Sequence, residues 1–234
     1  MSDREKILTR IREALRVQAP RPGVHGGALL DQGEDASHRH VPDYTDWLPL
    51  VGPEFADRTA LFAKNAADLK ADFHLLETAS ELPTKLTNLA TKSSWKRIST
   101  HRGSLTDAAL RGTFLEVVQV DGGYRVEAME ACDAGLTECE SLVAQTGSVL
   151  VSSRSSGGRA LSVLPPHHVV VARYSQMLGD LTQALALLEK KYAAIGYPSL
   201  LSFVTGPSRT GDIERILVLG AHGPKRLTIF CVPD

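Results

Sequence analysis

The residues best suited to chemistry lie near the C-terminus, in two loops that contain glycine and proline. The first loop follows an apolar run at residues 200–204 and reads Gly206-Pro-Ser-Arg-Thr-Gly-Asp-Ile-Glu214, and the second reads Gly220-Ala-His-Gly-Pro-Lys225. A strand that ends in a glycine-rich loop before a helix start leaves backbone N–H groups free for an anion, which the helix dipole also attracts. The two loops therefore predict a binding site for a small anionic ligand.

Side-chain donors strengthen this prediction, although a structural alternative stays open. Ser208, Arg209 and Thr210 supply hydroxyl and guanidinium groups that could hold a phosphate or a carboxylate. His222 could act as a general acid or base, or orient a ligand. A tight turn followed by a helix N-cap at Thr210 and Asp212 explains the same loop, and a single loop histidine can be purely structural.

The position of the loops relative to the predicted strands favours two of three candidates. These candidates are the turn at 144–148, the loop at 152–159 and the loop at 206–214. Ligands in open α/β sheets gather at the carboxyl ends of strands, which favours the second and third loops because the first precedes a strand. No Walker A, G-x-G-x-x-G or G-x-S-x-G motif accompanies them, so the catalytic residues stay unassigned.

Composition excludes several functional classes. The net charge of −1 over 234 residues disfavours nucleic-acid binding and adhesion to anionic membranes. No apolar run is long enough to span a bilayer, and the charged N-terminus does not resemble a signal peptide, so a cytoplasmic location is expected. Three cysteines (Cys132, Cys139, Cys231) without a C-x-x-C pair predict no iron–sulfur cluster or zinc site on this chain.

The chain is expected to consist of a peripheral helix, a linker and one larger domain. A capping-box pattern at Ser2 and Glu5, followed by apolar residues on one helical face, predicts a helix over 3–16. Polar, glycine- and proline-containing sequence then continues to about Pro42 and predicts a linker. The predicted organisation is an N-terminal helix at 1–18, a linker at 19–45 and an α/β domain at 46–234.

Alternating strand and helix patterns set the fold class of this domain. Strands are predicted at 72–77, 95–100, 114–120, 148–153, 168–172, 200–204 and 227–232. Helices are predicted with Pro53 at N1, over 82–90 with Pro83 in the first turn, at 107–110, and from an N-cap at Ser175 to Tyr192. This alternation indicates an α/β fold with a largely parallel sheet flanked by helices.

The motifs together resemble the LutC/YkgG family of lactate-utilisation proteins, which carry a LUD domain. The resemblance rests on Thr205-Gly-Pro-Ser-x-Thr-x-Asp-Ile-Glu214 with Gly220-x-His-Gly-Pro224, and on Ala144-Gln-Thr-Gly147 and Leu164-Pro-Pro-His167. It implies a fold similar to the NagB/RpiA/CoA-transferase-like fold. It also implies a role in oxidising L-lactate to pyruvate beside partner subunits, one of which carries iron–sulfur clusters, while this chain binds no cofactor itself.

The resemblance also adds Thr146 and Gly147, in the turn before residue 148, to the predicted anion site. The family tends to carry Glu where this chain has Gln145, so a carboxylate for acyl transfer is absent unless Glu138 or Glu140 replaces it. A stand-alone enzyme that binds CoA, a sugar phosphate or a nucleotide is the alternative function. The predicted ligand-binding set is Thr146, Gly147, Gly206, Pro207, Ser208, Arg209, Thr210, Asp212, Glu214, His222 and Gly223.

Overall fold

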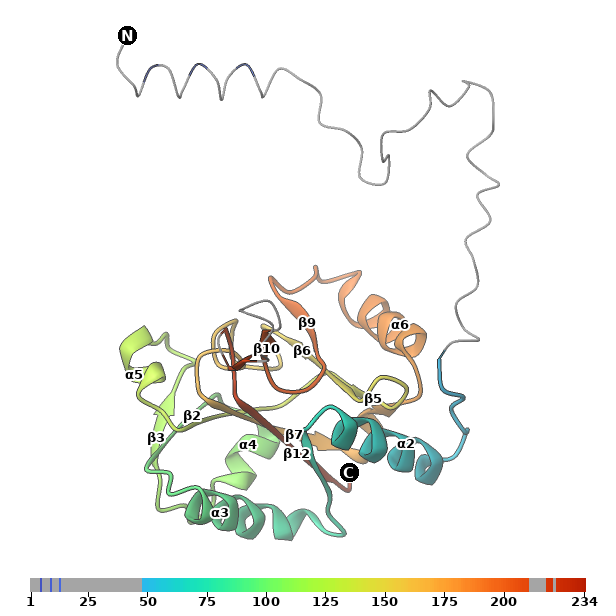
Figure 1. Cartoon of the computed structure of the whole chain (residues 1–234), viewed down its shortest axis with the longest axis horizontal. Helices are drawn as coiled ribbons and strands as arrows, with labels where there is room; N and C mark the ends of the chain where they lie inside the picture. The colour runs from blue at the N-terminus through green and yellow to red at the C-terminus, as the bar shows by residue number, and fades with distance from the viewer. Residues whose placement is uncertain (1–4, 6–8, 10–12, 14–47, 211–217, 221) are drawn as a thin grey trace. The chain divides into compact units, whose positions relative to one another are not determined.

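The computed structural model describes Glu5, Thr9, Glu13 and residues 48–210, 218–220 and 222–234 (Figure 1). By its internal contacts the chain separates into two units, 1–43 and 44–234. The predicted N-terminal helix and linker lie almost wholly outside the described residues, so the predicted domain boundaries stay a prediction.

A six-stranded sheet forms the centre of the second unit, and all of its strand pairings are parallel. The strand order is β1-β12-β7-β4-β2-β3. The two longest strands, β7 and β12, are rich in branched residues and almost completely buried, as expected for strands covered on both faces. The six strands are β1 (Asp72–Leu75), β2 (Arg97–Thr100), β3 (Glu116–Gln119), β4 (Ala134–Thr137), β7 (His167–Arg173) and β12 (Arg226–Val232).

A smaller four-stranded sheet, in the order β8-β5-β6-β9, packs against the parallel sheet. It contains β5 (Ser141–Val143), β6 (Ser148–Ser152), β8 (Met177–Leu178) and β9 (Leu201–Val204). Beyond β9 the chain forms a two-stranded antiparallel ribbon of β10 (Arg209–Thr210) and β11 (Val218–Leu219).

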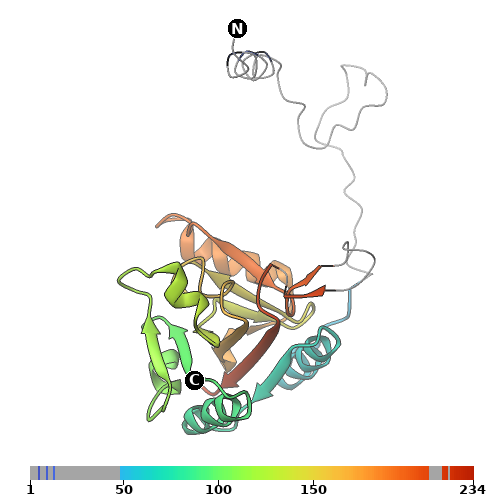
Figure 2. The ribbon, with the colours of Figure 1, turned by 60° about the vertical axis from the view of Figure 1, so that its left-hand side comes forward.

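Helices and the smaller sheet cover the parallel sheet on both faces (Figures 1 and 2). One face packs against α3 (Leu82–Lys92) and α4 (Ser104–Ala109). The other face packs against α2 (Phe55–Asp68) and the four-stranded sheet. On the far side of the smaller sheet lies α6 (Leu181–Tyr192). The remaining short helices are α5 (Val126–Glu130), η3 (Ala79–Glu81) and η4 (Tyr174–Gln176).

The predicted fold class is confirmed, because the largest sheet is parallel and flanked by helices. Pro83 lies in the first turn of α3, as predicted. The sequence patterns predicted neither β4 nor β5, because Ala-Gly-Leu-Thr and Ser-Leu-Val offer no run of branched or aromatic residues long enough to indicate a strand. No described helix has the length and apolar character needed to cross a bilayer.

Two local predictions are wrong. The long helix begins at Leu181 rather than after Ser175, because the Asp180 carboxylate caps it by accepting a hydrogen bond from Gln183 N at 2.8 Å. Helix α2 begins at Phe55 with Glu54 as the N-cap, so Pro53 lies outside it. Thr210 pairs in β10 with Val218 of β11, and the segment that Thr210 and Asp212 were predicted to cap lies outside the described residues.

Candidate functional site

The first predicted loop is built onto the C-terminal end of α2. Gly206 has a φ of +86°, and a Cβ atom there would lie 2.9 Å from the carbonyl oxygen of Leu69. The Arg209 guanidinium donates a hydrogen bond to the same carbonyl. Carbonyls in the last turn of a helix lack intrahelical donors, so a basic side chain satisfies them well. Arg209 therefore has a structural partner on α2, and the predicted role as a ligand contact is not needed to explain it.

Backbone hydrogen bonds join the first loop to the second. Ser208 N donates to Pro224 O at 2.9 Å, and Gly220 N donates to Ser208 O at 2.9 Å. A Cβ atom at Gly223 would lie 3.1 Å from Ser208 Cβ, so the two loops are in direct contact there. Pro207 is buried beside them. Two further predicted residues, Asp212 and Glu214, lie outside the described residues.

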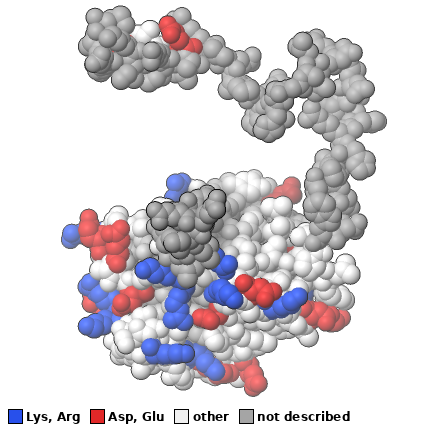
Figure 3. Space-filling view, viewed as in Figure 1, with Lys and Arg blue, Asp and Glu red and all other residues white. Residues whose placement is uncertain are grey.

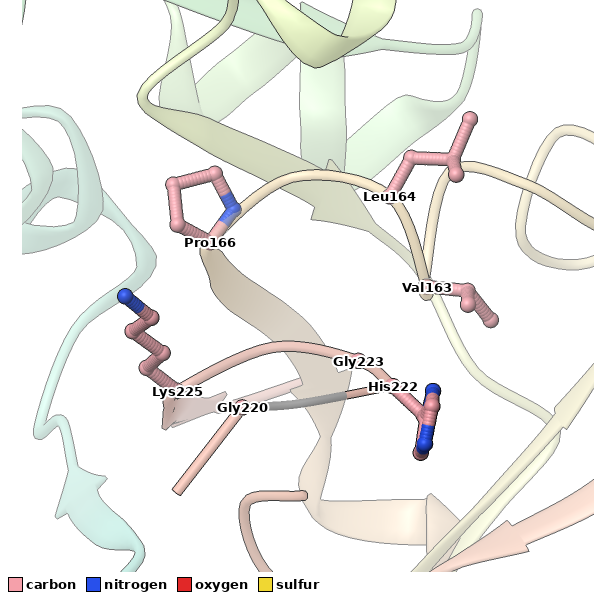
Figure 4. Close-up of a pocket in the computed structure, with 7 residues that line it drawn as sticks. All are labelled: Val163, Leu164, Pro166, Gly220, His222, Gly223 and Lys225. Atoms are coloured by element: carbon pink, nitrogen blue, oxygen red, sulfur yellow. The ribbon is translucent and has the colours of Figure 1, made fainter. Parts of the chain in front are cut away.

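The second loop forms one wall of an open pocket of about 410 Å³ (Figure 4). The opposite wall belongs to the segment that precedes β7, and Lys225 N ties the walls together by donating to Pro166 O at 2.8 Å. Of the predicted ligand-binding residues, His222 and Gly223 line this pocket. The described lining residues are Val163, Leu164, Pro166, Gly220, His222, Gly223 and Lys225.

The chemistry of this lining suits an organic anion. As far as the structure describes it, this lining contains one lysine, one histidine, two glycines and three apolar side chains, and no carboxylate. Among the described residues, no acceptor receives the backbone N–H groups of His222 and Gly223. Figure 3 shows Lys and Arg side chains gathered in the middle of one face of the molecule. Exposed basic residues around the two loops and the adjoining strands are Lys70, Arg209, Lys225 and Arg226.

The pocket lies at the amino ends of the parallel strands. The loop at 220–225 leads into β12, and Pro166 immediately precedes β7, which pairs with β12 from Arg226 and His167 onward. The loop at 206–214 does follow the carboxyl end of a strand, but that strand, β9, belongs to the smaller mixed sheet, where it pairs antiparallel with β6. The candidate site therefore lies at the amino ends of the strands, whereas α/β sheets usually bind ligands at the carboxyl ends.

The turn with Thr146 and Gly147 does not line this pocket. Gly147 has a φ of +64°, and a Cβ atom there would lie 2.8 Å from Asn65 Cβ on α2. The Asn65 amide clamps the turn by donating to Ala144 O at 2.8 Å and to Gln145 O at 3.0 Å. These contacts explain the small residue and the turn as packing on α2. A role in ligand binding stays a prediction for Thr146 and Gly147.

Neither nearby glutamate stands where Gln145 does. Glu138 and Glu140 precede β5, whereas Gln145 follows it, so the strand separates them. Gln145 Nε2 donates to Pro49 O at 3.2 Å. The Glu140 carboxylate is buried and accepts hydrogen bonds from Lys191 at 2.6 Å and from Ser152 and Tyr192. Glu138 is likewise engaged elsewhere, by backbone N–H groups of α4.

The histidine pair at the start of β7 lies beneath the pocket and is structural in its contacts. His167 Nε2 lies 2.8 Å from Thr228 Oγ1, and His168 Nε2 lies 2.9 Å from Thr137 Oγ1. Burial, with a further contribution from Arg226, lowers the pKa of His167 to about 4. Burial and the neighbouring His167 lower the pKa of His168 to about 3. Both imidazoles are therefore neutral near pH 7 and poorly placed for proton transfer to the pocket.

Sequence reasoning missed most of the pocket wall. Lys225 was noted in the second loop but not predicted as a ligand contact, although a lysine that directly follows Gly-Pro at a strand start was a usable signal. Leu164 and Pro166 belong to a motif of the family resemblance, but nothing local shows that the segment before β7 meets the loop before β12, and Val163 gave no signal at all. That contact depends on the pairing of β7 with β12.

All three cysteines are free and buried. Cys132 precedes β4 and Cys139 follows it, and Cys139 shares a core cluster with Cys231 of β12. Burial raises the pKa of the Cys231 thiol to about 12 and also raises the pKa of Cys139. Within the described ranges, no group of three His, Cys, Asp or Glu side chains could hold a metal ion.

These observations define an α/β protein whose candidate site is an anion-suited pocket between two loops. Residues 59–232 match the model of the LUD domain, so the chain belongs to the LUD domain family. A solved structure of a DUF162 family protein from Deinococcus radiodurans has the same fold, with a TM-score of 0.61 and 21% identity. The match covers 79% of this chain and 99% of that one.

Curated relatives carry the name lactate utilization protein C. The protein from Geobacillus kaustophilus is 33% identical over 114 residues, which is 48% of either chain. The protein from Halalkalibacterium halodurans is 35% identical over 130 residues, which is 52% of this chain and 56% of that one. The Bacillus subtilis protein is 32% identical over 114 residues, 48% of this chain. The matched segment spans about half the length of these relatives.

Proposed function

We propose that this chain is a LUD-domain component of a cytoplasmic lactate-utilisation system, and that it binds an organic anion in the pocket of His222, Gly223 and Lys225. In this proposal the system oxidises L-lactate to pyruvate, and iron–sulfur partner subunits carry the electrons. Relatives named lactate utilization protein C support the lactate role. The family resemblance supports the partners.

The observation that carries the binding part is the composition of the pocket. Lys225 and His222 line the pocket together with the apolar side chains of Val163, Leu164 and Pro166, and the described part of the lining holds no carboxylate. A carboxylate group gains a charge-assisted hydrogen bond from an ammonium group, which stabilises binding by roughly 1.5–3 kcal/mol. An adjacent apolar wall then rewards ligands that carry carbon as well as charge.

Growth on L-lactate tests the lactate role. A strain that lacks this gene should fail to grow on L-lactate as sole carbon source and grow normally on glucose, and the wild-type gene should restore growth. The double variant Lys225→Ala/His222→Ala should not restore it. Lys96→Ala, an exposed lysine outside the pocket lining, is the matched control and should restore growth fully. Normal growth of the deletion strain on L-lactate would contradict the lactate role.

Co-purification tests the partners. A tagged copy of this chain, expressed from its own locus during growth on L-lactate, should carry with it a protein that contains iron and acid-labile sulfide. The tagged chain alone should not oxidise L-lactate. Lactate oxidation by the isolated chain, without any iron in the preparation, would reject the proposed division of labour.

A further inference from the structure

The pocket is too large for lactate alone. L-lactate has a volume on the order of 100 Å³, about three times the share of one water molecule in the liquid, so the pocket of about 410 Å³ is about four times larger. Pockets that bury larger organic ligands have volumes of roughly 300–1,000 Å³. A three-carbon acid would leave most of the apolar wall in contact with water.

The two polar side chains also stand apart. Figure 4 shows Lys225 beside Pro166 at one end of the pocket and His222 near Val163 and Leu164 at the other, with Gly220 and Gly223 between them. The side chains of Lys225 and His222 do not point toward one another (Figure 4). A ligand that contacts both must therefore extend along the glycine-containing segment.

The lysine end is set in place by the backbone. Gly220 has a φ of +72°, and a Cβ atom there would lie 2.1 Å from Lys225 Cγ, so the lysine stem runs across the bare glycine. Lys225 N is fixed to Pro166 O at 2.8 Å. In the part of the chain that the structure describes, no carboxylate lies within ion-pair distance of Lys225. This end suits the anionic head of a ligand.

The histidine end suits an apolar body. Val163 is 44% exposed, so its apolar side chain is open to a ligand at this end of the pocket. Leu164 stands beside it, and the exposed imidazole of His222 completes this end. Leu164 also packs against the core cluster of Val120, Met129 and Leu161, so an aromatic ring placed here would remove water mainly from Val163 and contact the imidazole. The charge of the ligand and its apolar part are thus expected at opposite ends.

We propose that the ligand is an elongated organic anion, with its anionic head at Lys225 and a ring-bearing apolar body against Val163, Leu164 and His222. The inference rests on the proposed function in one respect, that this pocket is the ligand site. Phosphate and carboxylate heads share the chemistry that Lys225 recognises, and the choice of probes distinguishes them.

Titration calorimetry on the full chain with five probes tests this inference. ADP joins a phosphate head to a ring body, and phenylpyruvate joins a carboxylate head to one. L-lactate and inorganic phosphate are heads alone, and adenosine is a body alone. At least one of the two elongated probes should bind about tenfold or more tightly than every head or body alone.

Two variants with matched controls locate the contacts. Lys225→Ala should weaken the elongated probe roughly tenfold or more, because it removes a charge-assisted contact, while Lys96→Ala leaves the affinity unchanged. Val163→Asp should weaken the same probe to a similar degree. Its control is Val126→Asp, a similarly exposed valine (47% against 44%) on α5 outside the pocket lining. Circular dichroism checks that all four variants are folded.

The outcomes separate this inference from the proposed function. L-lactate binding as tightly as the elongated probes, with both pocket variants weakening it, would overturn the inference and leave the pocket as the lactate site. Adenosine binding as tightly as ADP would overturn the assignment of the head to Lys225. No binding of any probe would overturn the inference together with the pocket assignment, while growth on L-lactate decides the lactate role separately.

Discussion

The carboxyl ends and the amino ends of the strands in the parallel sheet are built in opposite ways. The chain runs from β2 outward to β3 and from β4 in the other direction to β7 and β12, so the direction switches between β2 and β4. The carboxyl ends at such a switch are the usual ligand site. Here Glu138 Oε1 accepts from Leu105 N at 2.8 Å, and His101 Nε2 accepts from Glu138 N at 3.1 Å. Protein groups therefore fill the usual site.

Glycines show how tightly the carboxyl ends are packed. A Cβ atom at Gly103 would lie 2.3 Å from Glu138 Oε1, and one at Gly157 would lie 2.5 Å from His101 Cβ. At the amino ends, by contrast, Lys225 N and Arg226 N donate to Pro166 O, and the pocket lies between the described parts of the loops before β7 and β12. In this fold, the candidate site lies where the connecting loops leave a pocket. The direction of the strands alone does not predict its position.

At pH 7.5 the largest expected effect concerns the tightly packed carboxyl side of this comparison. Glu140→Ala removes the acceptor of Lys191, Ser152 and Tyr192. Burial would raise the pKa of Glu140, but the hydrogen bonds from Lys191, Ser152 and Tyr192 outweigh it and hold the pKa below its ordinary value. Loss of such a network should lower the free energy of unfolding by about 3 kcal/mol, taken at the low end because Lys191 is half exposed.

Urea unfolding measures this effect, and Glu189→Ala on the exposed side of α6 is the control. The affinity of the pocket ligand should not change, because Glu140 follows the carboxyl end of β4, whereas the pocket lies at the amino ends of β7 and β12. If Glu140→Ala lost ligand affinity as well as stability, the carboxyl and amino ends of the strands would be coupled, and the contrast between them would be wrong.

The second prediction concerns His167 and His168, which directly follow the pocket residue Pro166. The pKa values of His167 and His168 fall from 6.5 to about 4 and about 3 on folding. Below pH 6.5 the unfolded chain binds protons that the folded chain does not, so stability falls as the pH falls toward 4. Each histidine contributes a slope of about 1.4 kcal/mol per pH unit.

Urea unfolding at pH 7.5, 6.0 and 5.0 measures this slope. The variant His167→Gln/His168→Gln keeps polar, neutral side chains and should remove most of the loss that the histidines cause. Equal slopes for the variant and the wild type would mean that the two imidazoles are already accessible to protons in the folded state.

Sequence patterns predicted the sheet well because burial leaves a local trace. The apolar runs of β6, β7 and β12 and the periodicity of α2 and α3 each reveal a covered face. The sequences of β4 and β5 show no such pattern. The start of α6 was misplaced because Ser175 and Asp180 both look like N-caps. Only the tertiary pairing of β8 with β5 excludes Ser175.

The candidate site was predicted less well, because its residues come from segments far apart in sequence. Loop composition found His222 and Gly223, which do line the pocket. The same reasoning favoured Arg209, whose guanidinium is taken by Leu69 O, since composition cannot show which carbonyl a basic side chain will meet. Whether the remaining predicted residues contact a ligand stays a prediction.

A third prediction tests the tight packing of the carboxyl edge. Gly157→Ala and Gly112→Ala both place a Cβ atom on a residue with left-handed φ, +63° and +69°, which costs about 1 kcal/mol each. Only Gly157 faces a neighbour, since nothing lies within 4 Å of a Cβ atom at Gly112. Thermal unfolding should show Gly157→Ala about 1 kcal/mol less stable than Gly112→Ala. Equal losses would mean that His101 moves aside freely and that this edge is less tightly packed than the contacts indicate.

The smallest expected effect concerns the carboxylate that fills the usual ligand position. Glu138→Gln keeps an oxygen that can accept from Leu105 N and Thr106 N but removes its charge. A hydrogen bond to a charged acceptor stabilises by about 1 kcal/mol more than one to a neutral acceptor, so the free energy of unfolding should fall by about that amount. Urea unfolding at pH 7.5 measures it, and Glu127→Gln on exposed α5 serves as the control. Because the pocket lies at the other edge, calorimetry should find its ligand affinity unchanged in Glu138→Gln. A large change in affinity without a change in stability would place the ligand at the carboxyl edge and reverse the comparison.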